Sequence, residues 1–184
     1  MGLVENDVKK GKCMIELFEY TTKYKDETLK RMAGFFGFHS GLYTENTAAN
    51  NSDFLPDNET IATLDIWSST DHALYIIFYG GVSVGFVHIG YRGGNVAWIE
   101  DIYVDKQHRG KGIASQAIKL SEEIIARNKN YNAVCIDAVP RNIAALKLYY
   151  RLGYINLSMI TVRKELYKNK SDKEVNFLGF DFKY

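Results

Sequence analysis

Residues 99–118, IEDIYVDKQHRGKGIASQAI, constrain the fold of this 184-residue chain more than any other stretch. The apolar run at 96–104 predicts a strand, and the basic turn R-G-K-G-I-A at 109–114 then opens a helix. Glycines let a backbone approach a ligand closely, and the first N–H groups of a helix have no intrahelical acceptor. With the helix dipole and the charges of Arg109 and Lys111, these donors predict a diphosphate cradle.

Hydrophobic patterning places further elements on both sides of this junction. It predicts helices at 26–42 and 143–152, the second capped by Asn142, and a long loop or broken helix at 44–60. Strands are predicted at 15–18, 74–79, 82–89, 133–139, 154–162 and 175–182. This order predicts an α/β (α+β) domain in which helices flank one twisted mixed sheet.

Composition narrows the class of protein. The hydrophobic content of 46% and charged content of 24% are ordinary for a globular protein, and no apolar run is long enough to cross a membrane. Cys13 and Cys135 suggest no framework of bridges, so we expect a reducing cytoplasm. We divide the chain into a loose arm at 1–13, a domain at 14–166 and an extension at 167–184 that adds a strand to the sheet or crosses to a second subunit, which leaves a homodimer open.

Other ligand motifs fit poorly. The sequence G-K-G-I-A-S at 110–115 lacks the last glycine of a dinucleotide fingerprint, and no Walker-type phosphate loop is present. The histidines are scattered without metal-ligand spacing, so we interpret them as structural and expect no metal; they are His39, His72, His88 and His108. The basic residues at 106–111 are too few for a nucleic-acid footprint in a chain of net charge +1.

Two motifs together resemble the GNAT superfamily of acyl-CoA N-acyltransferases. The cofactor motif [RQ]-x-x-G-x-[GA] is matched by Arg109, Gly112 and Ala114 after the strand. The second signature, N-x-x-A-x-x-L-Y-x-x-x-G-[FY], is matched by Asn142, Ala145, Leu148, Tyr149, Gly153 and Tyr154. The resemblance covers roughly residues 14–166 and implies a GNAT fold.

The resemblance also implies a cosubstrate, acetyl-CoA. Its pantetheine arm would pair with the backbone of Ile102 and Val104, with Tyr103 between them, and Asn142 would hydrogen-bond the arm. The diphosphate would lie on the turn and the first helical N–H groups, which belong to Arg109, Gly110, Lys111, Gly112, Ile113, Ala114 and Ser115.

Direct acetyl transfer to an amine needs a base for the ammonium and an acid for the leaving thiolate. By resemblance Tyr149 is the acid and contacts the cofactor; packing in the core is the alternative for it, and also for Tyr150. Glu100 is the candidate base, because Trp98 and Ile99 give it an apolar setting; an ion pair with a neighbouring side chain is the alternative. Asp101 is expected on the opposite face of the strand.

The acceptor is suggested by charge. Residues 32–91 contain six acidic residues and no Lys or Arg; the acidic residues are Glu45, Asp53, Asp57, Glu59, Asp65 and Asp71. An acidic acceptor wall would suit a cationic small molecule such as an antibiotic or polyamine, although solvated acidic loops would look the same. A protein N-terminal or lysine acetyltransferase and an acetyl-CoA-binding sensor or scaffold remain the alternatives. Looser similarity to streptothricin acetyltransferases supports the cationic small molecule. Looser similarity to ribosomal-protein N-terminal acetyltransferases supports the protein N-terminus.

Overall fold

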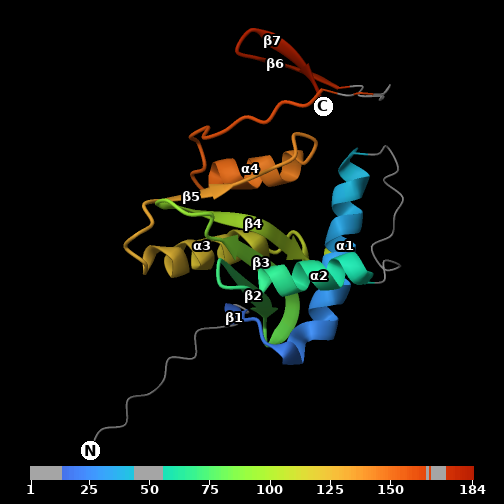
Figure 1. The fold of residues 1–184 in the computed structure, drawn as a ribbon, viewed down its shortest axis with the longest axis vertical. Helices are drawn as coiled ribbons and strands as arrows, with labels where there is room; N and C mark the ends of the chain where they lie inside the picture. Colours follow the sequence, from blue (N-terminus) through green and yellow to red (C-terminus); the bar gives the residue numbers. More distant parts are fainter. Residues whose placement is uncertain (1–13, 44–55, 165, 167–172) are drawn as a thin grey trace, which may run out of the picture.

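A computed structural model describes residues 14–43, 56–164, 166 and 173–184 of the chain. Five strands form one sheet in the order β1-β2-β3-β4-β5 (Figure 1). The strands are β1 (Ile15–Glu19), β2 (His72–Tyr79), β3 (Val82–Gly90), β4 (Val96–Val104) and β5 (Ala133–Ile136). The first four pair antiparallel; short turns join β2 to β3 and β3 to β4, whereas α1 and α2 lie between β1 and β2. β5 is parallel to β4 because α3 makes the crossover. The predicted mixed sheet is confirmed.

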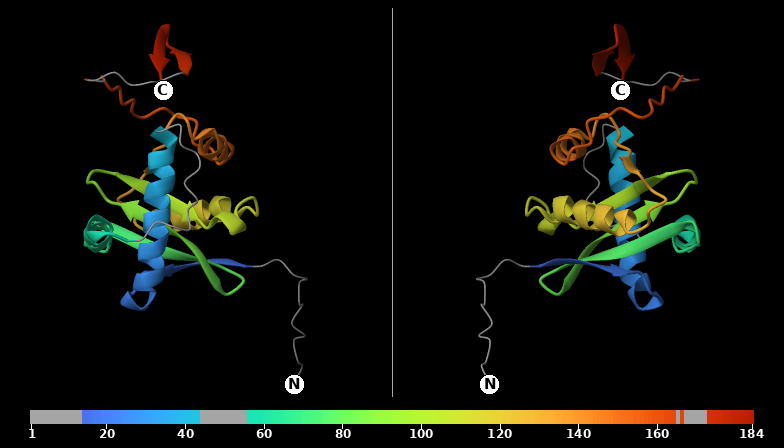
Figure 2. Two further views of the ribbon diagram at one scale, coloured as in Figure 1. Left: turned by 90° about the vertical axis from the view of Figure 1, so that its right-hand side faces the viewer. Right: turned by 90° about the vertical axis from the view of Figure 1, so that its left-hand side faces the viewer.

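Helices cover both faces of this sheet (Figure 2). α1 (Lys25–Tyr43) and α2 (Asn58–Trp67) pack on one face, around a core that includes Met32, Leu64 and Phe86. α3 (Ile113–Ala126) and α4 (Ile143–Arg151) lie on the other face, where the strands supply Val87 and Ile99. The side chains of β3 and β4 alternate between the two faces and therefore pack in two separate cores, as expected for a sheet covered on both sides.

One helix was not predicted. The polar stretch 44–60 was expected to be a loop or broken helix; its described part instead leads into α2, and residues 44–55 lie outside the described residues. Asp57 caps α2 by accepting hydrogen bonds from Thr60 N (2.8 Å) and Oγ1 (2.7 Å). Leu64 and Trp67 on this short helix are buried by the sheet, so tertiary packing stabilises a segment with weak local signals.

The sheet divides beyond the middle of β4. β5 pairs with Val96–Ile99 and the register ends at the pair Ile99–Ile136, so β5 is shorter than the predicted strand at 133–139. On its other side, β4 remains paired with β3 up to Val104. The second half of β4 thus has a backbone edge that no described strand covers.

A β-bulge lies at this point of division. Ile89 pairs with Ile99, but its neighbour His88 pairs with Asp101, which leaves Glu100 as the extra residue. The side chain of Glu100 occupies the space beside Gly90, while Asp101 contacts His88. His88 and Gly90 are two residues apart and share a face, so both carboxylates lie on the α1–α2 face. Our expectation that they face opposite ways is wrong, because a bulge interrupts strand alternation.

The C-terminal residues depart from the predicted pattern. Residues 154–162 form no strand in the structure, although an extra sheet strand was expected there. The second expected strand is a hairpin, β6 (Glu174–Phe177) and β7 (Phe180–Lys183), set apart from the main sheet (Figures 1 and 2). Phe180 in this hairpin is 67% exposed. The arm at 1–13 lies outside the described residues.

Candidate acetyl-CoA site and catalytic residues

The glycine turn is preorganised to meet an anion. Gly110 and Gly112 both adopt left-handed backbone angles, φ 77° and 79°, and apart from the adjacent residues no atom lies within 4 Å of a Cβ built on either. Gly112 is the N-cap of α3 and no side chain caps that helix end. The N–H groups of Ile113, Ala114 and Ser115 are in the first turn, where they have no intrahelical acceptor. The local geometry therefore fits a diphosphate.

The free edge of β4 leads directly to this turn. Asp105 N–H donates to the Val84 carbonyl on β3, 2.9 Å away. Backbone groups alternate in direction along a strand, so those of Ile102 and Val104 point away from β3, toward the open side. The side chain of Tyr103 is buried in the α1–α2 core. An extended ligand can therefore pair with this edge as an added strand would.

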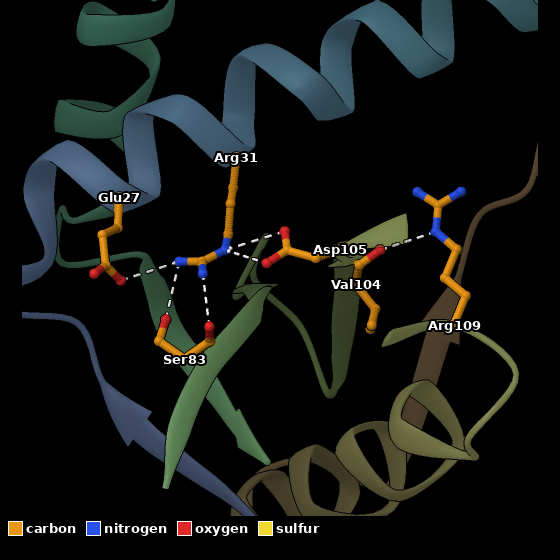
Figure 3. A network of polar contacts seen from close by, with 6 residues as sticks. All are labelled: Glu27, Arg31, Ser83, Val104, Asp105 and Arg109. Carbon is orange, nitrogen blue, oxygen red and sulfur yellow. Dashed lines mark hydrogen bonds and ion pairs between the residues drawn. The ribbon is translucent and has the colours of Figure 1, made fainter. Parts of the chain in front are cut away.

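The two basic side chains of the turn are directed differently. Arg109 Nε donates to the Val104 carbonyl at 2.9 Å (Figure 3). Its guanidinium lies 5.4 Å from the Tyr103 ring and 5.2 Å from the Phe38 ring. Lys111 lies 5.8 Å from the Tyr79 ring. The sequence predicts that both charges serve the cradle; in the structure, Arg109 also closes the turn back onto the end of β4.

A second arginine, which sequence reasoning missed, holds this turn to α1. Arg31 donates from Nε to both carboxylate oxygens of Asp105 at 3.2 Å and from Nη2 to the Ser83 carbonyl at 2.7 Å (Figure 3). Its Nη1 also contacts Ser83 Oγ and, at 3.3 Å, Glu27. Asp105 immediately precedes the basic turn, so this fork positions the segment that carries the cradle.

Replacing Arg31 with lysine should loosen the turn. Lysine keeps the charge but cannot serve Asp105 and Ser83 together in a fork, so we expect a loss of about 1–3 kcal/mol in the free energy of unfolding. We also expect acetyl-CoA affinity to fall several-fold, measured by calorimetry beside a thermal melt. Lys30→Arg on the same helix is the control, since Lys30 is exposed. Unchanged stability and affinity in Arg31→Lys would contradict the positioning role.

α4 presents the second motif. Asn142 Oδ1 accepts from Ala145 N at 3.2 Å, which confirms the predicted cap. Tyr149 packs with Ile99 and Ile118, whereas Tyr150 is 70% exposed, so the core position suggested for Tyr150 is wrong. Burial, and after it the negative charge of Asp101, raises the pKa of Tyr149 to about 12. Tyr149 is therefore a protonated donor throughout the neutral and moderately alkaline range.

The candidate base Glu100 is engaged in an ion pair. Arg92 Nε donates to Glu100 Oε1 at 2.7 Å, Arg92 Nη2 contacts the other oxygen, and the guanidinium stacks over Trp98 at 4.2 Å. The Glu100 side chain is 14% exposed. The paired carboxylate that the sequence left as an alternative is the arrangement found in the structure.

The structure brings together histidines that looked unrelated in the sequence. His88 Nδ1 lies 2.9 Å from Asp101 Oδ2, and His88 Nε2 lies 2.9 Å from His72 Nδ1. His88 is 2% exposed and stacks on Trp67, with ring centroids 4.4 Å apart. Antiparallel pairing of β2, β3 and β4 makes the cluster, so spacing along the chain could not reveal it.

Neither a metal centre nor a membrane-spanning helix is found among the described residues. No group of three or more His, Cys, Asp or Glu side chains in this part of the chain is placed to hold a metal ion. Among the described helices, none is both long and apolar enough to span a bilayer.

The chain folds into a mixed sheet that divides beside β4, with a glycine turn and an uncapped helix at the point of division. One known protein family matches it. The model of the acetyltransferase (GNAT) family matches residues 39–154, more than half of the chain. The chain belongs to this family.

Several named acetyltransferases are similar to part of this chain. An uncharacterized N-acetyltransferase of Methanocaldococcus jannaschii is 30% identical over 95 residues, which are 52% of this chain and 60% of the relative. Streptothricin acetyltransferase of Escherichia coli is 26% identical over 113 residues, 61% of this chain and 60% of the relative. A probable spermine N(1)-acetyltransferase of Bacillus subtilis subsp. natto is 27% identical over 86 residues. These matches span no more than about 60% of the relatives' length.

Solved structures agree on the fold. A metagenomic aminoglycoside acetyltransferase in complex with trehalose superimposes with a TM-score of 0.57 at 15% identity, covering 84% of this chain and 97% of its own. A transcriptional regulator from Bacillus halodurans gives a TM-score of 0.60 at 17% identity, covering 83% and 100%. At these identities the likeness concerns the fold alone.

Proposed function

We propose that this protein is an acetyl-CoA-dependent N-acetyltransferase that acts on a primary amine. The observation that carries the proposal is the direct continuation of the free β4 edge into the left-handed glycine turn and uncapped N-terminus of α3. One feature fits an extended amide-containing arm and the other fits the diphosphate to which that arm is joined. Membership of the GNAT family makes acetyl-CoA the cosubstrate of choice.

Each part of the site then has a binding role. The backbone of Ile102 and Val104 would pair with the arm, and Asn142 at the start of α4 would contact it from the opposite side of the split. The turn would hold the diphosphate through the residues that the sequence singled out: Arg109, Gly110, Lys111, Gly112, Ile113, Ala114 and Ser115.

Tyr149 is proposed as the acid. A phenol with a raised pKa does not ionise, and it can donate a hydrogen bond to negative charge that develops on sulfur. Glu100 was the hypothesis for the base. Its ion pair with Arg92 neutralises the carboxylate and occupies both of its oxygens, which weighs against that role.

A cationic small molecule is our proposed acceptor. Asp57, Glu59, Asp65 and Asp71 all lie exposed on α2 or beside its ends, where they add negative potential to that face of the sheet. Relatives named for streptothricin and spermine acetylation support the same chemical class. A protein N-terminus or lysine side chain is the alternative acceptor.

An acceptor screen tests this function. Release of free thiol from acetyl-CoA would be measured with spermine, streptothricin, sisomicin and short peptides. We expect the first three to react best, and we expect kcat/KM for a polycation to fall several-fold between low and physiological salt, since screening weakens attraction between exposed charges. Reaction with neutral or acidic acceptors alone would reject the cationic class, and absence of acetyl-CoA binding would reject the enzyme.

A further inference from the structure

We propose that Asp101, oriented by His88 and His72, is the base that removes the proton from the acceptor ammonium. This inference rests on the acetyltransferase function proposed above. It gives a chemical role to the hydrogen-bonded row of Asp101, His88 and His72. Packing of the core alone would not require these polar side chains.

The position of Asp101 suits that role. It is the second residue after the last β4–β5 pair, so it stands where the sheet opens. Its negative charge helps to raise the pKa of Tyr149 on α4 and opposes the lowering of the pKa of His39 on α1. Tyr149 packs against Ile99, the last β4 residue paired with β5 and two residues before Asp101, so the proposed acid and the proposed base flank the point of division from opposite faces of the sheet.

Asp101 also keeps one oxygen available. Oδ2 lies against His88 Nδ1, whereas Oδ1 accepts no hydrogen bond from any other residue that the structure describes, and the side chain is 20% exposed. Glu100, the adjacent carboxylate, has both oxygens on Arg92. Of the two acidic groups at the bulge, Asp101 can therefore receive a proton without breaking an ion pair.

Hydrogen bonding determines how the imidazoles are arranged. A carboxylate accepts, so His88 donates from Nδ1–H to Asp101. His88 Nε2 and His72 Nδ1, 2.9 Å apart, share a second hydrogen bond that links His72 to this pair. Trp67 stacks on His88 and restrains the ring, so the carboxylate is supported from β3 and, through His88, from β2. His88 and His72 are positioning residues in this scheme.

The hydrogen-bonded row of Asp101, His88 and His72 also reaches the protein surface. His72 lines a pocket of about 350 Å³ together with Asp71, Tyr91, Arg92 and Gly93. Charged and titratable groups that surround Asp101 are Glu100 on its own strand, Arg92 before β4, His88 on β3, His39 on α1 and Tyr149 on α4.

Asp101 Oδ1 takes one proton from the ammonium, and the freed nitrogen pair forms the N–C bond to the thioester carbonyl carbon. The C–S bond breaks, its electron pair leaves on sulfur, and Tyr149 supplies the proton that sulfur gains. A second proton lost from nitrogen, as the amide forms, restores Tyr149, and Asp101 releases its own proton to solvent.

Asp101→Asn is the decisive variant, assayed with spermine and acetyl-CoA. We expect kcat at pH 7 to fall about 100-fold, within the range for loss of a general base, with acetyl-CoA affinity by calorimetry nearly unchanged. The deficit should shrink to about tenfold at pH 9.5, because more of the amine is then unprotonated in solution. Asp26→Asn, at the exposed first turn of α1, is the charge-matched control.

Two further variants separate positioning from packing. An asparagine at position 88 can still donate to Asp101 but fills less space than leucine. We expect His88→Asn to keep kcat within about tenfold of the parent and His88→Leu to lose about 100-fold, each variant being checked by thermal melting. If only packing matters, leucine will be the better replacement, and that result overturns the positioning role.

The outcomes also separate this inference from the function beneath it. A parent protein that neither binds acetyl-CoA nor acetylates an amine overturns the proposed function. If the parent acetylates spermine and Asp101→Asn does so equally well at pH 7, the base assignment alone is overturned. A loss confined to Glu100→Gln would return the role to Glu100.

Discussion

Replacing Gly112 with valine is expected to weaken acetyl-CoA binding at least 100-fold. Gly112 has φ 79°, and a residue with a Cβ at such an angle costs about 1–2 kcal/mol, more for a β-branched side chain. The added side chain is also expected to hinder the approach of a diphosphate to the first N–H groups of α3. Hydrogen bonds to a charged group contribute about 1.5–3 kcal/mol each, so losing two weakens binding at least 100-fold.

The control for this variant is Gly94→Val. Gly94 has a similar φ of 73° and, like Gly112, no atom apart from those of the adjacent residues within 4 Å of an added Cβ. It lies in the turn before β4, at the end of that strand away from the cradle. Both variants should lose comparable stability in a thermal melt, but Gly94→Val should bind acetyl-CoA normally by calorimetry. Normal binding by Gly112→Val would reject the cradle.

Tyr149→Phe is expected to lower kcat about 100-fold, in the range attributed to a general acid, while the Kd for acetyl-CoA changes little. Removing one hydroxyl leaves the packing against Ile99 and Ile118 in place but takes away the donor to sulfur. Steady-state turnover at saturating substrate, beside calorimetry, would separate the two effects. Tyr150→Phe is the matched control, since the adjacent side chain is largely exposed.

The pH profile adds a second check on Tyr149. Because burial raises its pKa to about 12, the folded protein keeps the phenol protonated well above pH 10. We therefore expect kcat to show no alkaline decline from this group up to pH 10.5, whereas an ordinary phenol would be more than half ionised there. Turnover in Tyr149→Phe equal to that of the parent would remove the tyrosine from the acid role.

Local signals were sufficient for several elements. β4 has the predicted bounds, and Asn142 caps α4 as its side chain and position indicated, because capping depends on groups only three residues apart. Local signals failed where tertiary packing determines the secondary structure. α2 depends on burial of Leu64 and Trp67, and the strand expected at 154–162 is absent because apolar alternation does not provide a pairing partner.

In the candidate site, too, the sequence determined some features and only the tertiary structure determined others. Residue types and spacing alone determined the glycine turn, the helix that follows it and the tyrosine of the second motif, since each lies within one short segment. Only the tertiary structure decided the state of the carboxylates. The bulge turned Glu100 and Asp101 to one face, where Arg92 neutralises the first and His88 orients the second. Those partners come from neighbouring strands or turns, and strand pairing is a long-range property that no local pattern encodes.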